Sequence, residues 1–162
     1  MRAILPILSL ACATLLRAQA PPRDPFLDQL VGTWQASGTV AGERIGYDIQ
    51  AKWILQDNFL AIDLTDTAKA PQYMAHVSIG YDAPSKRYVM HWLDIFGARS
   101  SETLGYGTLQ DNTIAFRFEY PDGPFINAFT FDRSARTWTS HATTKNSKGE
   151  WEVFSDITLK PR

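Results

Sequence analysis

The sequence contains a single cysteine, Cys12, which lies in a largely apolar segment at the start of the chain. This segment, residues 3–16, follows an arginine, is too short to span a bilayer as a helix, and precedes the small residues Ala18 and Ala20. Such an order is typical of a secretory signal peptide. We therefore predict a signal peptide over residues 1–20. The mature chain would then lack cysteine, which excludes disulfides, thiol nucleophiles and cysteine metal ligands.

The predicted signal peptide implies export, so we expect the protein to be periplasmic or secreted. Two alternatives fit the segment less well. An uncleaved membrane anchor would need a longer apolar run than residues 3–16, which also contain Pro6. A lipoprotein would need a lipobox before Cys12, and Ser9-Leu10-Ala11 fits that motif poorly.

The chain also lacks a basic run or a stripe of Lys and Arg. It has 16 basic and 17 acidic residues, and loss of Arg2 and Arg17 with the signal peptide leaves 14 against 17, a net charge of −3. This balance makes nucleic acid and anionic membrane surfaces poor partners. No second apolar run is long enough to span a bilayer, so we expect no membrane insertion after signal removal. The sequence does not indicate the oligomeric state.

Helical periodicity is confined to one short segment after a polar leader over residues 21–25. The apolar residues spaced as one helical face are Phe26, Leu27, Leu30 and Val31. Gly32 is expected to end this helix. From Gly32 onward the period changes to two and turn signals recur about every ten residues, which is typical of an all-β sandwich or barrel. We predict one domain over residues 26–162.

Three strands show their buried faces most clearly. Their alternating apolar residues are Ile45, Tyr47, Ile49, Ala51, Trp53 and Leu55; Ile114, Phe116, Phe118 and Tyr120; and Trp151, Val153, Ile157 and Leu159. Further strands are expected near residues 33–40, 58–66, 72–81, 86–94, 99–109, 125–132 and 136–144. About ten strands with short connections predict an antiparallel up-and-down β-barrel, because closure removes exposed edges. A sandwich is the alternative, because alternation alone does not show closure.

Several motifs resemble a known family. Leu30-Val31-Gly32-Thr33-Trp34 resembles the Gly-x-Trp opening of calycin barrels, the superfamily of lipocalins and fatty-acid-binding proteins. The motifs that follow it are Ile54-Leu55-Gln56-Asp57-Asn58-Phe59-Leu60, Gly80-Tyr81-Asp82, Lys86-Arg87-Tyr88-Val89, Trp92-Leu93-Asp94 and Gly97. Their order is similar to that in secreted bacterial lipocalin-like proteins grouped as domain of unknown function 1579, over roughly residues 26–160. The sequence departs from that family at Gln56-Asp57, where paired glycines are usual. The resemblance implies a calycin-like barrel with Trp34 across one end, and no particular chemistry.

Aromatic residues are plentiful in the predicted strands. They are Trp34, Tyr47, Trp53, Tyr88, Trp92, Phe116, Phe118, Phe129, Phe131, Trp138 and Trp151. In a barrel of this size such rings either fill the interior or line a cavity for one small apolar ligand. We favour a cavity lined by Tyr47, Trp53, Tyr88 and Trp92, and a filled barrel is the alternative.

Two histidines form a second candidate site. If residues 82–85 are a four-residue hairpin loop, Tyr81 pairs with Lys86, and His76 lies directly opposite His91. The pair would contact a ligand or act as acid and base; an ordinary hydrogen-bonded pair on the sheet is the alternative. Two histidines are too few for a closed metal site, so we predict no metal and no cofactor.

No nucleophile motif of the Gly-x-Ser-x-Gly type occurs, and we assign no catalytic residue. Tyr106 lies between Gly105 and Gly107, which indicates a strand kink or a close backbone approach.

These observations predict an exported lipocalin-like barrel that binds a small, largely apolar molecule. The predicted binding residues are Tyr47, Trp53, Tyr88, Trp92, His76 and His91. One alternative is an enzyme that acts on a small apolar substrate through the histidine pair. The other is an envelope or interaction protein with a filled barrel and no ligand.

Overall fold

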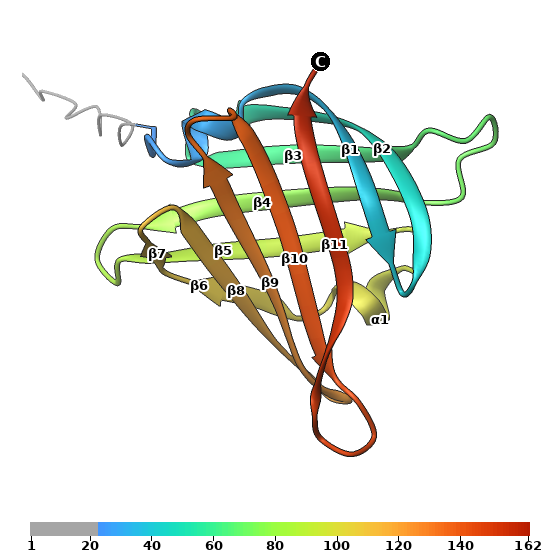
Figure 1. The fold of residues 1–162 in the computed structure, drawn as a ribbon. Helices are drawn as coiled ribbons and strands as arrows, with labels where there is room; N and C mark the ends of the chain where they lie inside the picture. Colours follow the sequence, from blue (N-terminus) through green and yellow to red (C-terminus); the bar gives the residue numbers. More distant parts are fainter. Residues whose placement is uncertain (1–22) are drawn as a thin grey trace, which may run out of the picture.

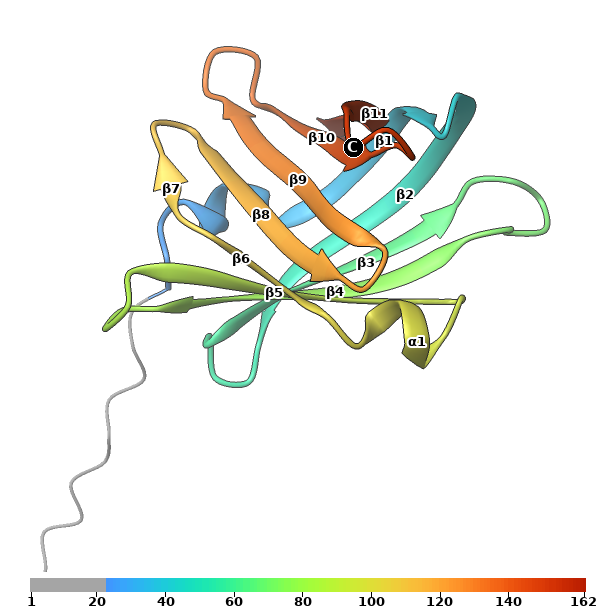
Figure 2. The same ribbon diagram turned by 90° about the horizontal axis from the view of Figure 1, so that it is seen from below.

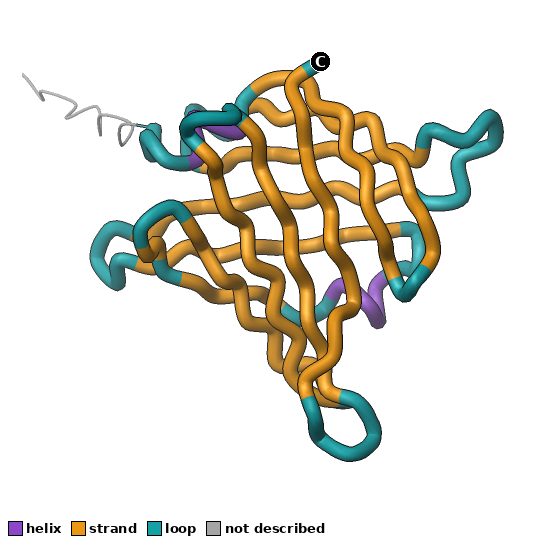
Figure 3. Tube along the Cα trace, viewed as in Figure 1, coloured by secondary structure: helices purple, strands orange, loops and turns teal. Residues whose placement is uncertain are grey.

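The structure is a computed structural model that describes residues 23–162. The predicted signal peptide over residues 1–20 and the start of the predicted leader lie outside the described residues. Within the described part the fold is all-β, as predicted, and strands make up most of it (Figure 3). The helical elements there are one 3₁₀ turn, η1 (Leu27–Leu30), and one short helix, α1 (Ala98–Ser101).

Antiparallel strands follow one another around a closed barrel (Figures 1 and 2). They are β1 (Gly32–Val40), β2 (Glu43–Ile54), β3 (Phe59–Asp66), β4 (Met74–Asp82), β5 (Arg87–Asp94), β6 (Leu104–Gly107), β7 (Leu109–Gln110), β8 (Thr113–Tyr120), β9 (Gly123–Asp132), β10 (Thr137–Lys145) and β11 (Trp151–Pro161). β1 pairs with both β2 and β11, and β6 pairs with β8, so the ring has no free edge there. The predicted up-and-down barrel is confirmed, with ten strands in the ring, and the sandwich alternative is wrong.

The sixth strand of the ring is interrupted. β6 and β7 pair with the same neighbour, because Gly105 lies opposite Phe118 and Leu109 lies opposite Ile114, both on β8. The strand expected over residues 99–109 is therefore wrong in its first part, where α1 forms instead. A side chain at position 105 would meet the Phe118 ring at 2.4 Å, so glycine permits the close approach that the sequence indicated.

The inner faces of β2 and β8 follow the predicted alternation, except at the end of β2. Tyr47, Ile49 and Ala51 are buried, whereas Leu55 is 68% exposed. Leu55 lies in the β2–β3 turn, where it and the next two residues, Gln56 and Asp57, have φ values of +51°, +56° and +63°. Left-handed backbone of this kind favours glycine, and three consecutive non-glycine residues adopt it here.

A bulge changes the face of β11. Ala142 lies opposite Ser155 but Thr143 lies opposite Val153, so Phe154 is an extra residue in its strand. Beyond the bulge the β10–β11 hairpin projects from the barrel (Figure 1). Trp151 and Val153 are consequently exposed, and their predicted place on the buried face is wrong.

η1 fills one end of the barrel, which we call the closed end. Leu27 and Leu30 are buried there. The indole N–H of Trp34 donates to the Leu30 carbonyl at 2.7 Å, and that of Trp138 donates to the Gln29 carbonyl at 3.2 Å. Trp34 thus packs across this end, as the resemblance implied.

The predicted helical face is correct except at Val31, which is 40% exposed. Asp24 holds the start of η1, since its Oδ1 accepts from the backbone N–H groups of Phe26 and Leu27 at 3.0 and 2.9 Å. α1 lies at the other end, which we call the open end (Figures 1 and 2).

Candidate functional site

A cavity of about 730 Å³ occupies the open end of the barrel. Its wall comes from β1–β3, β5 and β8–β11, together with the segment before β4, α1 and the loop before α1. Several of its lining residues are exposed, among them Phe96, Arg99 and Asp122, so the cavity opens to solvent at this rim. A volume of this size is typical of small-molecule sites.

The barrel is filled below this cavity. A small void of about 30 Å³, with room for about one water molecule, separates it from Leu30 of η1. Tyr47 and Trp92 line both spaces. The two alternatives from the sequence, a filled interior and a hollow one, therefore each describe one half of this barrel.

One side of the open-end cavity is an aromatic cluster built around Tyr73. Its ring lies 5.7 Å from Tyr47 and 5.9 Å from Phe96, measured between centroids. The indole N–H of Trp92 donates to the Tyr73 hydroxyl at 2.9 Å, and that hydroxyl donates to Asp94 Oδ2 at 3.3 Å. This chain of hydrogen bonds holds the rings in place on the wall.

A second aromatic cluster lines the cavity from β8, β9 and β11. The rings of Phe118 and Tyr120 are stacked with centroids 5.7 Å apart, and Phe125 contacts Phe154 edge to face at 5.4 Å. The bulge in β11 brings Phe154 to the cavity, because it is the extra residue there. Apolar rings from both clusters therefore line the cavity.

The phenols of the cavity are neutral at physiological pH. Burial raises the pKa of Tyr47, Tyr73 and Tyr120 above the ordinary tyrosine range. Nearby carboxylates add to the effect, Asp66 for Tyr47 and Asp94 for the other two.

Buried polar residues lie among the rings on three neighbouring strands. Asn127 of β9, Ser140 of β10 and Ser155 of β11 line the cavity and are each 5% exposed. Ser140 Oγ donates to Asn127 Oδ1 at 2.8 Å. Buried polar groups require hydrogen-bond partners, so these residues are the natural points of specific contact in an otherwise apolar space.

Of the four aromatic residues predicted to line a cavity, Tyr47 and Trp92 do so. The structure places Trp53 and Tyr88 at the closed end instead. Trp53 Nε1 donates to Asp28 of η1 at 2.7 Å, and the Tyr88 hydroxyl donates to Asp24 Oδ2 at 2.9 Å. These two residues fasten η1 to the barrel.

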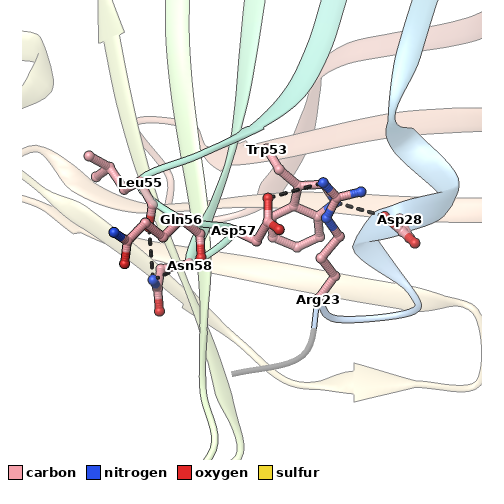
Figure 4. A network of polar contacts seen from close by, with 7 residues as sticks. All are labelled: Arg23, Asp28, Trp53, Leu55, Gln56, Asp57 and Asn58. Atoms are coloured by element: carbon pink, nitrogen blue, oxygen red, sulfur yellow. Dashed lines mark hydrogen bonds and ion pairs between the residues drawn. The ribbon is translucent and has the colours of Figure 1, made fainter. Parts of the chain in front are cut away.

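Figure 4 shows how the closed end is held. Arg23 pairs with Asp57 of the β2–β3 turn at 3.1 Å, and its guanidinium lies 5.9 Å from the centroid of the Trp53 ring. Asn58 Nδ2 donates to the Leu55 carbonyl at 2.8 Å and stabilises the left-handed turn.

The predicted pairing of His76 with His91 is wrong. His76 lies opposite Leu93, and His91 lies opposite Ser78. The loop has four residues, as expected, but it comprises residues 83–86, because Asp82 stays in β4 and pairs with Arg87. That shift of one residue in the loop moves the pairing by two positions.

Both histidines lie on the outer face of the barrel, away from the cavity. A ring nitrogen of His76 lies 2.6 Å from Asp63 Oδ1, and His91 Nε2 lies 2.8 Å from the carbonyl oxygen of Ser101, at the end of α1. Each histidine therefore has its own local partner.

Between residues 23 and 162, no group of three or more His, Cys, Asp or Glu side chains is arranged to hold a metal ion. Neither helix in that part of the chain is long and apolar enough to cross a membrane.

Sequence reasoning missed the polar residues of the cavity, although a signal for them existed. Asn127 shares the inward parity of Phe129 and Phe131, and Ser140 shares that of Trp138. A polar residue that interrupts an inward aromatic stripe is a candidate for ligand contact. Tyr73 was also missed, although it lies in the strand expected over residues 72–81 and shares the inward parity of Ala75, Val77 and Ile79.

Comparison with known proteins agrees with the motifs. The model of a family described as "Protein of unknown function (DUF1579)" matches residues 21–159. No curated protein matches the chain.

Proposed function

The chain belongs to the DUF1579 family, and from that premise we propose that it is a lipocalin-like barrel that binds a small, largely apolar molecule reversibly in the open-end cavity. The observation that carries this proposal is the cavity itself. It measures about 730 Å³ and is walled by two aromatic clusters, whereas the other half of the barrel is filled. Barrels of this size bind one small ligand when their interior is left open.

The difference between the blocked end and the solvent-exposed end of the barrel supports reversible binding. η1 blocks the closed end through buried leucines and through hydrogen bonds from Trp34 and Trp138. A ligand would therefore enter and leave at the rim near Phe96, which is 70% exposed. Burial of an apolar molecule against the rings would supply most of the binding free energy.

We also propose that the protein acts outside the cytoplasm, as the pattern of residues 1–20 predicts. N-terminal sequencing of protein recovered from the periplasmic and culture fractions tests this point. A mature chain beginning at Pro21 in either fraction is the expected result. An intact N-terminus in the cytoplasmic fraction contradicts it.

The binding proposal is tested with the neutral fluorescent probe N-phenyl-1-naphthylamine and two matched variants. Trp92→Ala removes a ring from the cavity wall, whereas Trp53→Ala removes a ring of the same kind at the closed end. We expect saturable, stoichiometric binding to the unmodified protein, an affinity reduced about tenfold or more in Trp92→Ala, and little change in Trp53→Ala.

Circular dichroism verifies that both variants fold. A folded protein that binds no probe, or equal loss of affinity in the two variants, contradicts the proposal. Native mass spectrometry of gently purified protein then identifies any ligand that it carries.

A further inference from the structure

We propose that the open-end cavity selects neutral molecules that carry a carbonyl-type hydrogen-bond acceptor, and that the side-chain amide of Asn127 recognises that acceptor. The inference rests on the proposed function and names the class of ligand for the same site.

The amide of Asn127 is oriented by its neighbour. Its Oδ1 accepts the hydroxyl hydrogen of Ser140 at 2.8 Å, which turns Nδ2 away from that contact. Across residues 23–162, no residue accepts a hydrogen bond from this nitrogen in the structure. Asn127 lines the cavity and its Nδ2 is not a fully buried atom, so its two N–H groups are accessible from the cavity and can donate to an acceptor inside it. A carbonyl oxygen of a ligand would be such an acceptor.

The strand register leaves space beside this amide. Asn127 lies opposite Ala142, and Ala142 lies opposite Ser155, so the three residues form a row across β9, β10 and β11. Asn127 and Ser155 line the cavity, and the small side chain of Ala142 between them is buried, so the row leaves room for a ligand group beside the amide. Ser155 contributes a hydroxyl to the same patch, which gives a ligand oxygen a second donor.

The charges of the cavity disfavour an anionic ligand. The charged residues that line it are Asp94, Arg99, Glu102 and Asp122. Three carboxylates against one guanidinium give this set a net charge of −2, which repels a carboxylate or phosphate at the entrance.

The same carboxylates do not form a deep site for a cation. Glu102 and Asp122 are exposed and solvated. Asp94 already accepts from the Phe96 backbone N–H at 3.0 Å and from the Tyr73 hydroxyl at 3.3 Å. The buried polar groups of the cavity are neutral, and a neutral ligand matches them.

The test uses four pyrene derivatives of nearly equal size: 1-acetylpyrene, 1-ethylpyrene, 1-pyrenecarboxylate and 1-pyrenemethylamine. They present a carbonyl acceptor, no polar group, an anion and a cation. We expect the unmodified protein to bind 1-acetylpyrene about tenfold more tightly than 1-ethylpyrene, and both charged compounds more weakly. Asn127→Leu should remove the preference for the ketone, and circular dichroism of the variant verifies that the barrel is folded.

A second measurement does not depend on a variant. Hydrogen bonding lowers the infrared C=O stretching frequency of 1-acetylpyrene, so the bound compound should absorb below its frequency in hexane. A frequency equal to that in hexane overturns the inference.

The outcomes separate the two proposals. If none of the four compounds binds, the proposed function fails. If 1-ethylpyrene binds as tightly as 1-acetylpyrene, or if either charged compound binds most tightly, the cavity binds ligands but Asn127 does not select a carbonyl. A preference for the ketone that survives in Asn127→Leu also overturns the role of Asn127.

Discussion

Substitution of Gly105 by alanine tests how the barrel closes. The ring is completed where β6 meets β8, and two residue pairs form that contact, Gly105 with Phe118 and Tyr106 with Arg117. A Cβ atom on Gly105 would lie 2.4, 2.6 and 2.8 Å from three atoms of the Phe118 ring. Carbon atoms in contact lie about 3.5–4.0 Å apart, so the ring or the strand must move by about 1 Å.

The expected cost follows from two opposing effects. Overpacking of this kind costs about 1–3 kcal/mol. Replacement of glycine by alanine in a strand stabilises the fold by about 0.5–1 kcal/mol, because alanine gives the unfolded chain less conformational entropy, and less entropy is then lost on folding. Phe118 borders the open-end cavity, so its ring has space to yield. We therefore expect a net loss of about 1 kcal/mol in the free energy of unfolding.

Urea denaturation followed by tryptophan fluorescence measures this loss, with Gly46→Ala as the control. A Cβ on Gly46 would make one close contact, 2.9 Å to the exposed Thr67 hydroxyl, and its other contacts, at 3.8 and 4.0 Å, are ordinary van der Waals distances. The control should lie within about 0.5 kcal/mol of the unmodified protein. In a Phe118→Leu background, Gly105→Ala should cost less than in the unmodified protein, because the clashing ring is absent. An unchanged stability in Gly105→Ala, or the same cost in both backgrounds, refutes the reasoning.

Four further results are expected. Gln56→Gly should raise the free energy of unfolding by about 1 kcal/mol in the same urea assay, because Gln56 adopts a left-handed backbone conformation that is unfavourable by about that amount for any residue with a Cβ atom. A loss of stability contradicts this. Trp53→Phe removes the 2.7 Å hydrogen bond to η1 and should cost about 1 kcal/mol without changing probe affinity, and a lowered affinity would place Trp53 in the binding site. Burial raises the pKa of Tyr73, so its contribution to stability is complete below about pH 10 and declines as the pH rises further. Thermal unfolding between pH 9 and 11 should show a smaller decline in Tyr73→Phe, and an identical decline would refute this. Finally, His76→Ala and His91→Ala should leave probe affinity unchanged, because both side chains lie outside the barrel, and a loss in either would refute the placement.

The sequence by itself determined the fold class and the faces of most strands. Period-two alternation is a local property, because successive side chains of a strand point to opposite sides. It therefore identified the inner residues of β2 and β8 and, with the turn signals, the number of strands in the ring. The short apolar segment before Gly32 likewise predicted the helical turn that became η1.

Only the tertiary structure decided where along the barrel each inward side chain lies. Trp53 and Trp92 were both expected to line one cavity, but alternation does not specify distance from either end. η1 packs at the end where Trp53 lies, so that half is filled and Trp92 is left beside the hollow half.

The register between strands could not be predicted from the sequence either. A loop placed one residue too early put His76 opposite His91, although the same loop length with Asp82 in the strand separates them. The bulge exposes Trp151 and brings Phe154 to the cavity. It leaves no trace in the sequence of β11, where apolar residues alternate as in a regular strand. Register and bulges depend on hydrogen bonds between strands, and those bonds exist only after the chain has folded, which is why the cavity had to be found in the structure.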